Sequence, residues 1–277
     1  MGHQFTAMPP EDLRQIQLLQ LEMLLEVDRI CKKNKIKYNI SYGTLLGAVR
    51  HQGFIPWDDD ADVTMLRAEY EKFCKVCERE LDSRRFYLQN HVNTPGYRWG
   101  YGKIRRVGTE YVREGQEHLP YRTGVFIDIF PLDFVPDNGL ARRFHHICCT
   151  IIRKLQWSEV GKRTDSSAFM RSVYRCLSWI PRSAVFKMYD ALRNFSNRKP
   201  TTRVRTLTFP TPNNGQYGFD CKWFNELAEV AFEGHRFPAT RDFDDYLTFT
   251  YGNYLELPPV EKRKGHPATR YKLLESE

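Results

Sequence analysis

The sequence lacks any long apolar run. Across its 277 residues, no stretch approaches the roughly 18 uninterrupted apolar residues of a membrane-spanning helix, so no membrane span is predicted. The first residues, MGHQFTAMPPEDL, also lack the apolar core of a signal peptide. Repeats and low-complexity tracts are missing as well. These absences predict a cytoplasmic protein with an ordinary folded core.

Zinc-ligand patterns are lacking too. Only Cys74 and Cys77 form a CxxC, and they lie inside EYEKFCKVCERELD, which has the character of a helix. A second CxxC and an HxxxH are absent, so a structural zinc site is not predicted. The seven cysteines are best interpreted as reduced thiols.

Positive charge is concentrated in one segment. The whole chain carries a net charge of +8, but residues 139–205 hold 15 lysines and arginines against three acids, and the remainder has a net charge of −4. Such a segment indicates a polyanionic partner, which includes nucleic acid, anionic lipid and phosphate-bearing substrates. Nucleic acid is the weakest of these, because no known recognition module is present.

Apolar and basic residues alternate within this segment. Phe144, Ile147 and Ile151 are interleaved with Arg143 and Arg153, a pattern typical of a helix lying on an anionic membrane surface. The segment therefore predicts either a peripheral contact with the inner face of the cell membrane or a helical subdomain with solvated basic faces.

The order of predicted elements indicates an α/β (α+β) fold, with a mixed sheet flanked by helices. A helix is expected from about Pro10 to Lys33, and short strands are expected near 36–40, 61–66, 86–91, 98–106 and 110–114. The most apolar strand is GVFIDIFPLDFV, and two or three basic helices follow it. The expected organisation is one domain over 1–277, with an N-terminal helix (1–35), a core (36–138), a basic helical subdomain (139–205) and a completing C-terminal part (206–277). This last part is expected to mix short loops, a helix near FDDYLTFTYG and an irregular tail.

Carboxylates gather at the start of one predicted strand. Asp60 and Asp62 are two residues apart, and residues at that spacing point to the same face of a strand. Asp128 lies within the apolar strand, where an unpaired carboxylate would be costly. If the two strands are neighbours, the three acids form a site whose hard oxygen ligands suit Mg²⁺ or Mn²⁺. Taken alone, a DxD is usually a solvated loop, so the prediction depends on the combination.

A glycine turn precedes these acids. Gly43 and Thr44 are expected to form a tight turn into a short helix, whose free backbone N–H groups can bind phosphate oxygens. Such a turn is common as a purely structural feature. Together with the acids it predicts phosphoryl transfer on a nucleotide.

Three blocks, GTLLGAVRHQGFIPWDDDADV, GVFIDIFPLD and YGNYLELPPVEKRKGHP, resemble the LicD family over roughly residues 36–266. The resemblance implies the fold of DNA polymerase beta-like nucleotidyltransferases. It also implies transfer of phosphocholine from CDP-choline to sugar hydroxyls of teichoic acid or lipopolysaccharide. By position, Gly43 and Thr44 match the family's turn and Asp60 and Asp62 its metal-binding pair. Asp128 matches the third acid, with Asp133 in the same block as the alternative.

The resemblance also implies roles for other residues. An acceptor hydroxyl would attack the choline-bearing phosphorus, CMP would leave, and Asp128 would take the proton. Arg50, Lys103 and Arg105 are candidates to balance phosphate charge, and Arg50 is favoured because it lies inside the first block. Asp58 is expected to support the site from the loop, with Asp59 pointing the opposite way.

Choline is expected to be held by aromatic faces, because a quaternary ammonium has no hydrogen to donate. Trp57, Trp99 and Tyr101, together with Tyr97, are the candidates, and each is equally well explained as a packing residue. The acceptor is expected to be a lipid-linked glycan. Alternative interpretations are transfer of another CDP-linked group, such as ribitol phosphate or phosphoethanolamine, and a nucleic-acid-binding protein of nucleotidyltransferase type.

Overall fold

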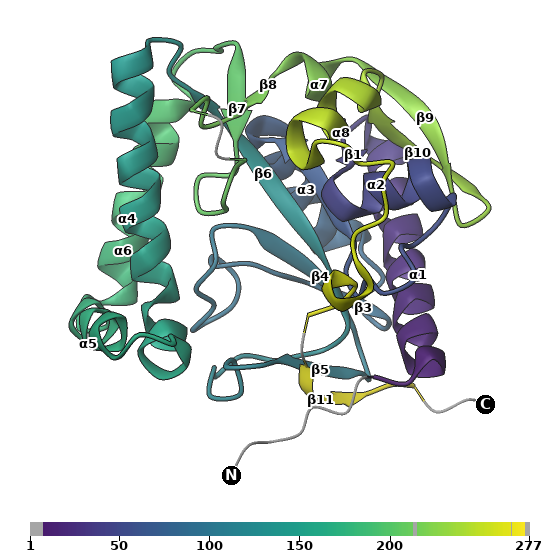
Figure 1. The fold of residues 1–277 in the computed structure, drawn as a ribbon, viewed down its shortest axis with the longest axis horizontal. Coiled ribbons are helices and arrows are strands. Elements are labelled where there is room, and N and C mark those ends of the chain that lie inside the picture. The colour runs from purple at the N-terminus through teal and green to yellow at the C-terminus, as the bar shows by residue number, and fades with distance from the viewer. Residues whose placement is uncertain (1–7, 213–214, 267, 275–277) are drawn as a thin grey trace.

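The fold is a mixed sheet covered by helices, as the sequence predicts (Figure 1). It is described here by a computed structural model for residues 8–212, 215–266 and 268–274. The main sheet has the order β1-β2-β6-β4-β3, in which β2 and β6 run parallel and the other neighbours antiparallel. β7 pairs with β6, and β8 pairs with β7. The strands of this sheet are β1 (Asn39–Ile40), β2 (Asp62–Leu66), β3 (Phe86–Gln89), β4 (Gly102–Arg106), β6 (Phe126–Val135), β7 (Arg203–Arg205) and β8 (Phe219–Asp220).

The helix α1 (Pro10–Asn34) confirms the predicted N-terminal helix. Proline at the first position and acids in the first turn are features that favour a helix start. Its buried face includes Ile16, Leu24 and Val27, which recur at helical spacing. The remaining helices around the sheet are α2 (Tyr42–His51), α3 (Arg67–Glu80), α7 (Lys222–Asn225), α8 (Phe243–Tyr251) and the short 3₁₀ helix η1 (Val260–Lys262).

The basic segment forms three helices, and we call them the helical layer: α4 (Gly139–Thr164), α5 (Ala168–Leu177) and α6 (Arg182–Ser196). They lie together at one side of the sheet, on the left in Figure 1. The Asn138 side chain starts α4 by accepting hydrogen bonds from the backbone N–H groups of Leu140 and Ala141. Within the described residues, no helix combines the length and hydropathy that crossing a bilayer requires.

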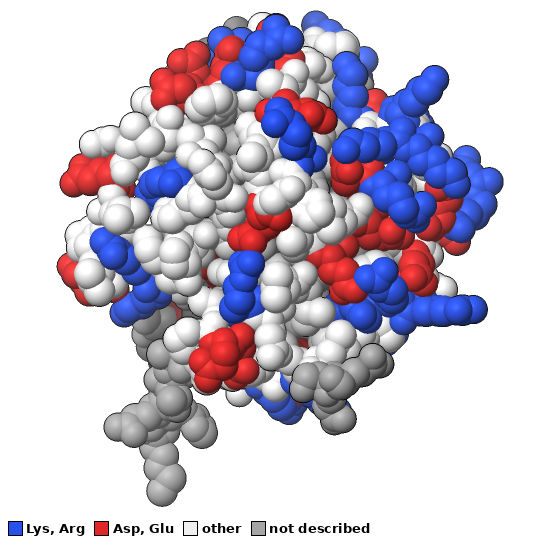
Figure 2. Space-filling model, turned by 90° about the vertical axis from the view of Figure 1, so that its right-hand side faces the viewer, with Lys and Arg blue, Asp and Glu red and all other residues white. Residues whose placement is uncertain are grey.

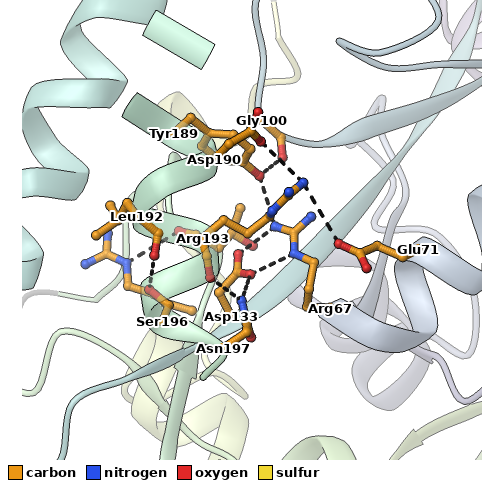
Figure 3. Close-up of polar contacts among 12 residues, drawn as sticks. Arg67, Glu71, Gly100, Asp133, Tyr189, Asp190, Leu192, Arg193, Ser196 and Asn197 are labelled. Carbon is orange, nitrogen blue, oxygen red and sulfur yellow. Dashed lines mark hydrogen bonds and ion pairs between the residues drawn. The ribbon is translucent and has the colours of Figure 1, made fainter. Parts of the chain in front are cut away.

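A buried ion pair fastens this layer to the sheet (Figure 3). Arg67, at the start of α3, donates to both carboxylate oxygens of Asp133 on β6, at 2.7 and 2.6 Å. The same guanidinium donates to the Tyr189 hydroxyl of α6 at 2.9 Å, and Asn197 donates to Asp133 at 2.6 Å. Tyr189 in turn donates to the carbonyl of Gly100 at 2.7 Å. The Asp133 carboxylate is therefore occupied by a structural contact that connects α3, β6 and the end of α6.

The C-terminal part is more regular than expected. Instead of loops and an irregular tail around one helix, it contains the hairpin β9 (Leu227–Phe232) and β10 (His235–Thr240), and a last strand, β11 (Ala268–Lys272). The hairpin turns through Glu233 and Gly234, both at positive φ, as a two-residue type I′ turn requires. β11 pairs with β5 (Glu110–Arg113), so β5 is a strand, as predicted, but outside the main sheet.

Candidate active site

Three carboxylates meet where β2 and β6 lie side by side. Asp62 and Asp128 are register partners in this parallel pair, and the N–H of Asp128 donates to the carbonyl of Ala61 at 2.9 Å. Asp60 lies in the segment just before β2 and not within the strand, yet its carboxylate joins the others. Oxygen atoms of Asp60, Asp62 and Asp128 all lie within 4.8 Å of one another. We call this group the acid cluster, and it is able to hold a metal ion.

The electrostatics of the acid cluster fit a cation. Burial and the charges of Asp60 and Asp128 raise the pKa of Asp62 well above its ordinary value. Burial, with the charges of Asp60 and Asp59, raises the pKa of Asp58 to about 8. Asp58, Asp60 and His266 form a second group whose ligand atoms lie within 4.8 Å of one another. A cation among these oxygens would remove the repulsion that raises both pKa values.

Two basic side chains contact the acid cluster. Lys103 on β4 is the cross-strand neighbour of Asp128, and its Nζ contacts Asp128 Oδ1 in a pair whose side chains are both 5% exposed. Burial lowers the pKa of Lys103 to about 7 even though Asp128 acts to raise it. Arg113 on β5 lies 2.9 Å from Asp60 Oδ2. Sequence reasoning missed Arg113, because its contact depends on where the β5–β11 pair lies relative to the sheet.

The predicted glycine turn takes a different form. Tyr42, and not Gly43, has the positive φ, at 51°, where the chain enters α2. Gly43 instead allows a close approach, since a Cβ added to it would lie 2.8 Å from Asp58 Oδ2. The Thr44 hydroxyl accepts a hydrogen bond from the N–H of Asp62 at 2.7 Å. This pair therefore holds the start of β2 and leaves room for the Asp58 carboxylate at the N-terminus of α2.

Asp59 points away from the acid cluster toward other partners. Its carboxylate accepts hydrogen bonds from the His266 N–H at 2.8 Å and from the Tyr111 hydroxyl. Burial alone would raise the pKa of Asp59, but hydrogen bonds with the His266 side chain, whose Nδ1 lies 3.0 Å from Oδ1, with Tyr111 and with the His266 backbone bring it below its usual value. His266 Nδ1 also lies 3.4 Å from Asp60 Oδ2. The C-terminal segment, yellow in Figure 1 between α8 and β11, thereby reaches the site, a contact for which only the block YGNYLELPPVEKRKGHP gave a signal.

The two predicted arginines have backbone partners. Arg50 lies in the last turn of α2, at the opposite end of the helix from Gly43, and donates to the carbonyl of Tyr254 at 2.8 Å. Arg105 on β4 donates to Gln89 Oε1 and to the carbonyl of Gly124, both at 2.7 Å. Of the three predicted basic residues, Lys103 contacts an acid of the cluster, whereas the partners of Arg50 and Arg105 described here lie elsewhere. Roles for Arg50 and Arg105 in phosphate binding stay predictions.

The predicted aromatic residues lie in two places. Trp57 directly precedes the acidic run and is half-buried, with the Arg263 guanidinium 5.2 Å from its ring centre. Trp99 packs on Trp157 with ring centres 5.6 Å apart, and Tyr101 packs on Phe130 at 4.7 Å. Tyr97 is fully buried. A cation also lies over the ring of Tyr101, since Lys103 Nζ is 5.4 Å from its centre. Trp57 differs from Tyr101 in that it directly precedes the acidic run.

Trp99 and Tyr101 are among the residues that line a small cavity of about 30 Å³. Lys103, Arg105 and Arg113 also line it. A quaternary ammonium is repelled by like charges at short range. The cavity is also small, so in this form it does not suit choline.

Comparison with known proteins agrees with this geometry. Residues 35–160 match the family model described as "LicD/FKTN/FKRP, nucleotidyltransferase domain". The lipopolysaccharide cholinephosphotransferase LicD of Haemophilus influenzae is 30% identical over 265 residues, which cover 92% of this chain and 95% of that protein. This chain belongs to the LicD family. Membership makes it a phosphotransferase, as the sequence predicts. Two uncharacterized proteins match shorter stretches: one of Rickettsia typhi is 44% identical over 55 residues and one of Rickettsia prowazekii 48% over 48, each match covering 18% of the relative.

Proposed function

We propose that this LicD-family protein moves phosphocholine from CDP-choline to a hydroxyl of a cell-surface glycan precursor, in lipopolysaccharide or teichoic acid, and releases CMP. The observation that carries the proposal is the acid cluster, in which three carboxylates lie within 4.8 Å of one another beside the N-terminus of α2. A relative of nearly the same length is named as a lipopolysaccharide cholinephosphotransferase, which supports this choice of donor group and acceptor.

Mg²⁺ or Mn²⁺ is the proposed cofactor. Asp60, Asp62 and Asp128 would hold it, because an all-carboxylate donor set suits a hard divalent cation. When bound there, such an ion supplies positive charge to the diphosphate of the donor. Within the chain, Lys103 holds Asp128 and Arg113 holds Asp60, so two of the three carboxylates are fixed in orientation before any substrate arrives.

The proposed reaction is a displacement at phosphorus. The acceptor oxygen forms a bond to the choline-bearing phosphorus, and the bond from that phosphorus to the CMP oxygen breaks. The proton of the acceptor hydroxyl passes to a carboxylate oxygen of Asp128, which lies on the most buried strand of the site. The backbone N–H groups in the first turn of α2, near Gly43 and Thr44, are proposed to bind donor phosphate oxygens.

The acceptor is proposed to be a lipid-linked glycan, reached from the cytoplasmic side with a peripheral contact to an anionic membrane. The alternative is that another CDP-linked group, ribitol phosphate or phosphoethanolamine, is the one transferred. A panel of CDP-linked donors separates these, because ethanolamine needs hydrogen-bond acceptors where choline needs aromatic faces. A nucleic-acid-binding role is disfavoured, and a gel shift with a steep salt dependence would be its signature.

The test measures CMP release from CDP-choline with Mg²⁺ and candidate glycolipids. Asp60→Asn, Asp62→Asn and Asp128→Asn are each expected to lower turnover by about 100-fold or more. Asp245→Asn is the matched control, because Asp245 is an exposed acid on α8. Two outcomes would refute the proposal. One is a folded Asp62→Asn variant with the turnover of the wild type, and the other is wild-type protein that keeps its turnover in EDTA.

A further inference from the structure

The helix α4 exposes an apolar stripe to solvent. Leu140, Phe144, Ile147 and Ile151 are 82%, 68%, 47% and 46% exposed. Their spacing of four, three and four residues places them along one line of the helix. We call these four side chains the α4 apolar face. Such a continuous stripe on a helix that is already packed into a fold marks an interaction surface.

The packing of α4 explains why this stripe is free. His145, Cys149 and Ile152 face inward and are almost completely buried. His145 bonds Ser196 of α6 at 2.8 Å, and Cys149 and Ile152 pack with Phe186 of α6. On a helical projection this inner set lies nearly opposite the α4 apolar face. Over residues 140–152 the helix therefore has two apolar sides, and the fold buries only one of them, whereas farther along Leu155 and Ser158 are buried as well.

Basic side chains accompany the α4 apolar face. Arg143 and Lys154 are exposed on the same helix, and the helical layer belongs to the segment with 15 basic and three acidic residues. Further exposed apolar side chains are Phe169, Met188 and Phe195 in the layer, and Trp179 and Ile180 in the connection between α5 and α6. The face that Figure 2 shows is different, because there lysines and arginines lie next to acids.

From these observations we infer that the helical layer docks on an anionic lipid bilayer, with the α4 apolar face inserted among the headgroups. Apolar side chains bordered by arginine and lysine are the chemistry of interfacial helices. A second copy of the chain fits less well, since two segments of net charge +12 would repel each other. The inference builds on the proposed function, because a lipid-linked acceptor would be found at that surface.

Contacts within the fold would fix the position of the active site relative to a docked helical layer. The buried contacts of Arg67, Asp133 and Tyr189 join α6 to β6, so the helical layer and the sheet are held together (Figure 3). Asp133 and Asp128 lie on the same strand, five residues or about 16 Å apart. Docking would therefore hold the acid cluster at a fixed distance from the lipid surface, near a glycan that projects from it.

The experiment is vesicle flotation of the full chain, without donor or metal. The probes are vesicles of phosphatidylcholine with and without phosphatidylglycerol, at about 0.05 and 0.5 M salt. The variant Phe144→Ser/Ile147→Ser removes two members of the apolar face, and Leu18→Ser/Val92→Ser removes two exposed apolar side chains elsewhere. Arg143→Glu/Lys154→Glu is matched by Lys75→Glu/Arg79→Glu on α3. Circular dichroism checks that every variant is folded.

We expect the wild type to float with the anionic vesicles at low salt, and the Phe144→Ser/Ile147→Ser and Arg143→Glu/Lys154→Glu variants to partition at least about tenfold more weakly. Both controls should float like the wild type. Failure of the wild type to float, or unchanged flotation of Phe144→Ser/Ile147→Ser, overturns the inference. The inference is also overturned if the wild type is a dimer and the Phe144→Ser/Ile147→Ser variant is a monomer, because the α4 apolar face would then bind a second copy of the chain. A chain that floats but releases no CMP refutes only the proposed function.

Discussion

Asp62 and Asp128 face each other across the parallel strands β2 and β6 as register partners. The backbone hydrogen bond from Asp128 to Ala61, at 2.9 Å, fixes this register. A slip of one residue would turn one of the two carboxylates to the other side of the sheet. The position of both acids is therefore set by the sheet and not by a flexible loop, which suits a site that must hold charge at a fixed place.

Asp58→Asn should stabilise the metal-free protein, increasingly so as the pH rises. The pKa of Asp58 is raised to about 8, so the folded state keeps the proton that the unfolded chain releases near pH 4. Stability from this group is complete below pH 4 and is lost as the pH rises toward 8. Asparagine removes that loss. Urea unfolding in EDTA should show the advantage of the variant growing between pH 5 and pH 8, to at least about 1 kcal/mol.

A saturating divalent cation should abolish this advantage, because the cation offsets the repulsion among the acids. Asp245→Asn, at an exposed position, should show no pH-dependent difference from the wild type. If the Asp58→Asn advantage is the same at pH 5 and pH 8, the raised pKa inferred for Asp58 is wrong.

Gly43→Ala should impair transfer more than it impairs folding. The added Cβ would lie 2.8 Å from Asp58 Oδ2, so the carboxylate must move. Alanine is the better helix former by about 1 kcal/mol, which limits the loss of stability. We expect at least a tenfold fall in CMP release, in the range of a displaced catalytic contact. Gly139→Ala at the start of α4 is the control, because a Cβ there meets nothing within 4 Å; equal activity of both variants would contradict the contact.

Trp57→Ala should weaken CDP-choline binding, whereas Trp99→Ala should mainly lower stability. Trp57 is half-buried beside the acidic run, and its ring already accepts the guanidinium of Arg263. Loss of one cation–π contact should reduce affinity by about threefold to thirtyfold in isothermal titration. Trp99 is 7% exposed and packs on Trp157, so its removal leaves a cavity costing about 3 kcal/mol. Unchanged affinity in a folded Trp57→Ala variant would remove Trp57 from the choline site.

Arg67→Met should lower the free energy of unfolding by about 3 kcal/mol or more, because it leaves Asp133 buried without its main partner. Adding Asp133→Asn should recover part of this loss, since the uncompensated charge is then gone. Arg236→Met is the control, because its pair with Glu229 is exposed and should contribute less than about 1 kcal/mol. Similar losses for Arg67→Met and Arg236→Met in urea unfolding would contradict the role of the buried pair.

Local patterns allowed much of the fold to be predicted. α1 and α3 follow from helical spacing, and β6 from its apolar run, because these signals lie within a few neighbouring residues. The hairpin β9–β10 was not predicted, although Glu233 and Gly234 form its turn. The strand expected near 36–40 is shorter than predicted and contains only Asn39 and Ile40. The proposed division into a core, a basic subdomain and a C-terminal part stays a prediction.

The sequence by itself determined which residues are proposed to do the chemistry: the acids around Asp60, the glycine before them and Asp128 in its apolar strand. Residue type and spacing are local properties, so they are readable without the fold. Only the tertiary structure decided that Arg113 contacts Asp60, that His266 reaches Asp59, and that Asp133 pairs with Arg67. These contacts join segments far apart in the chain, and their partners are set by strand register and helix packing, which no local pattern specifies.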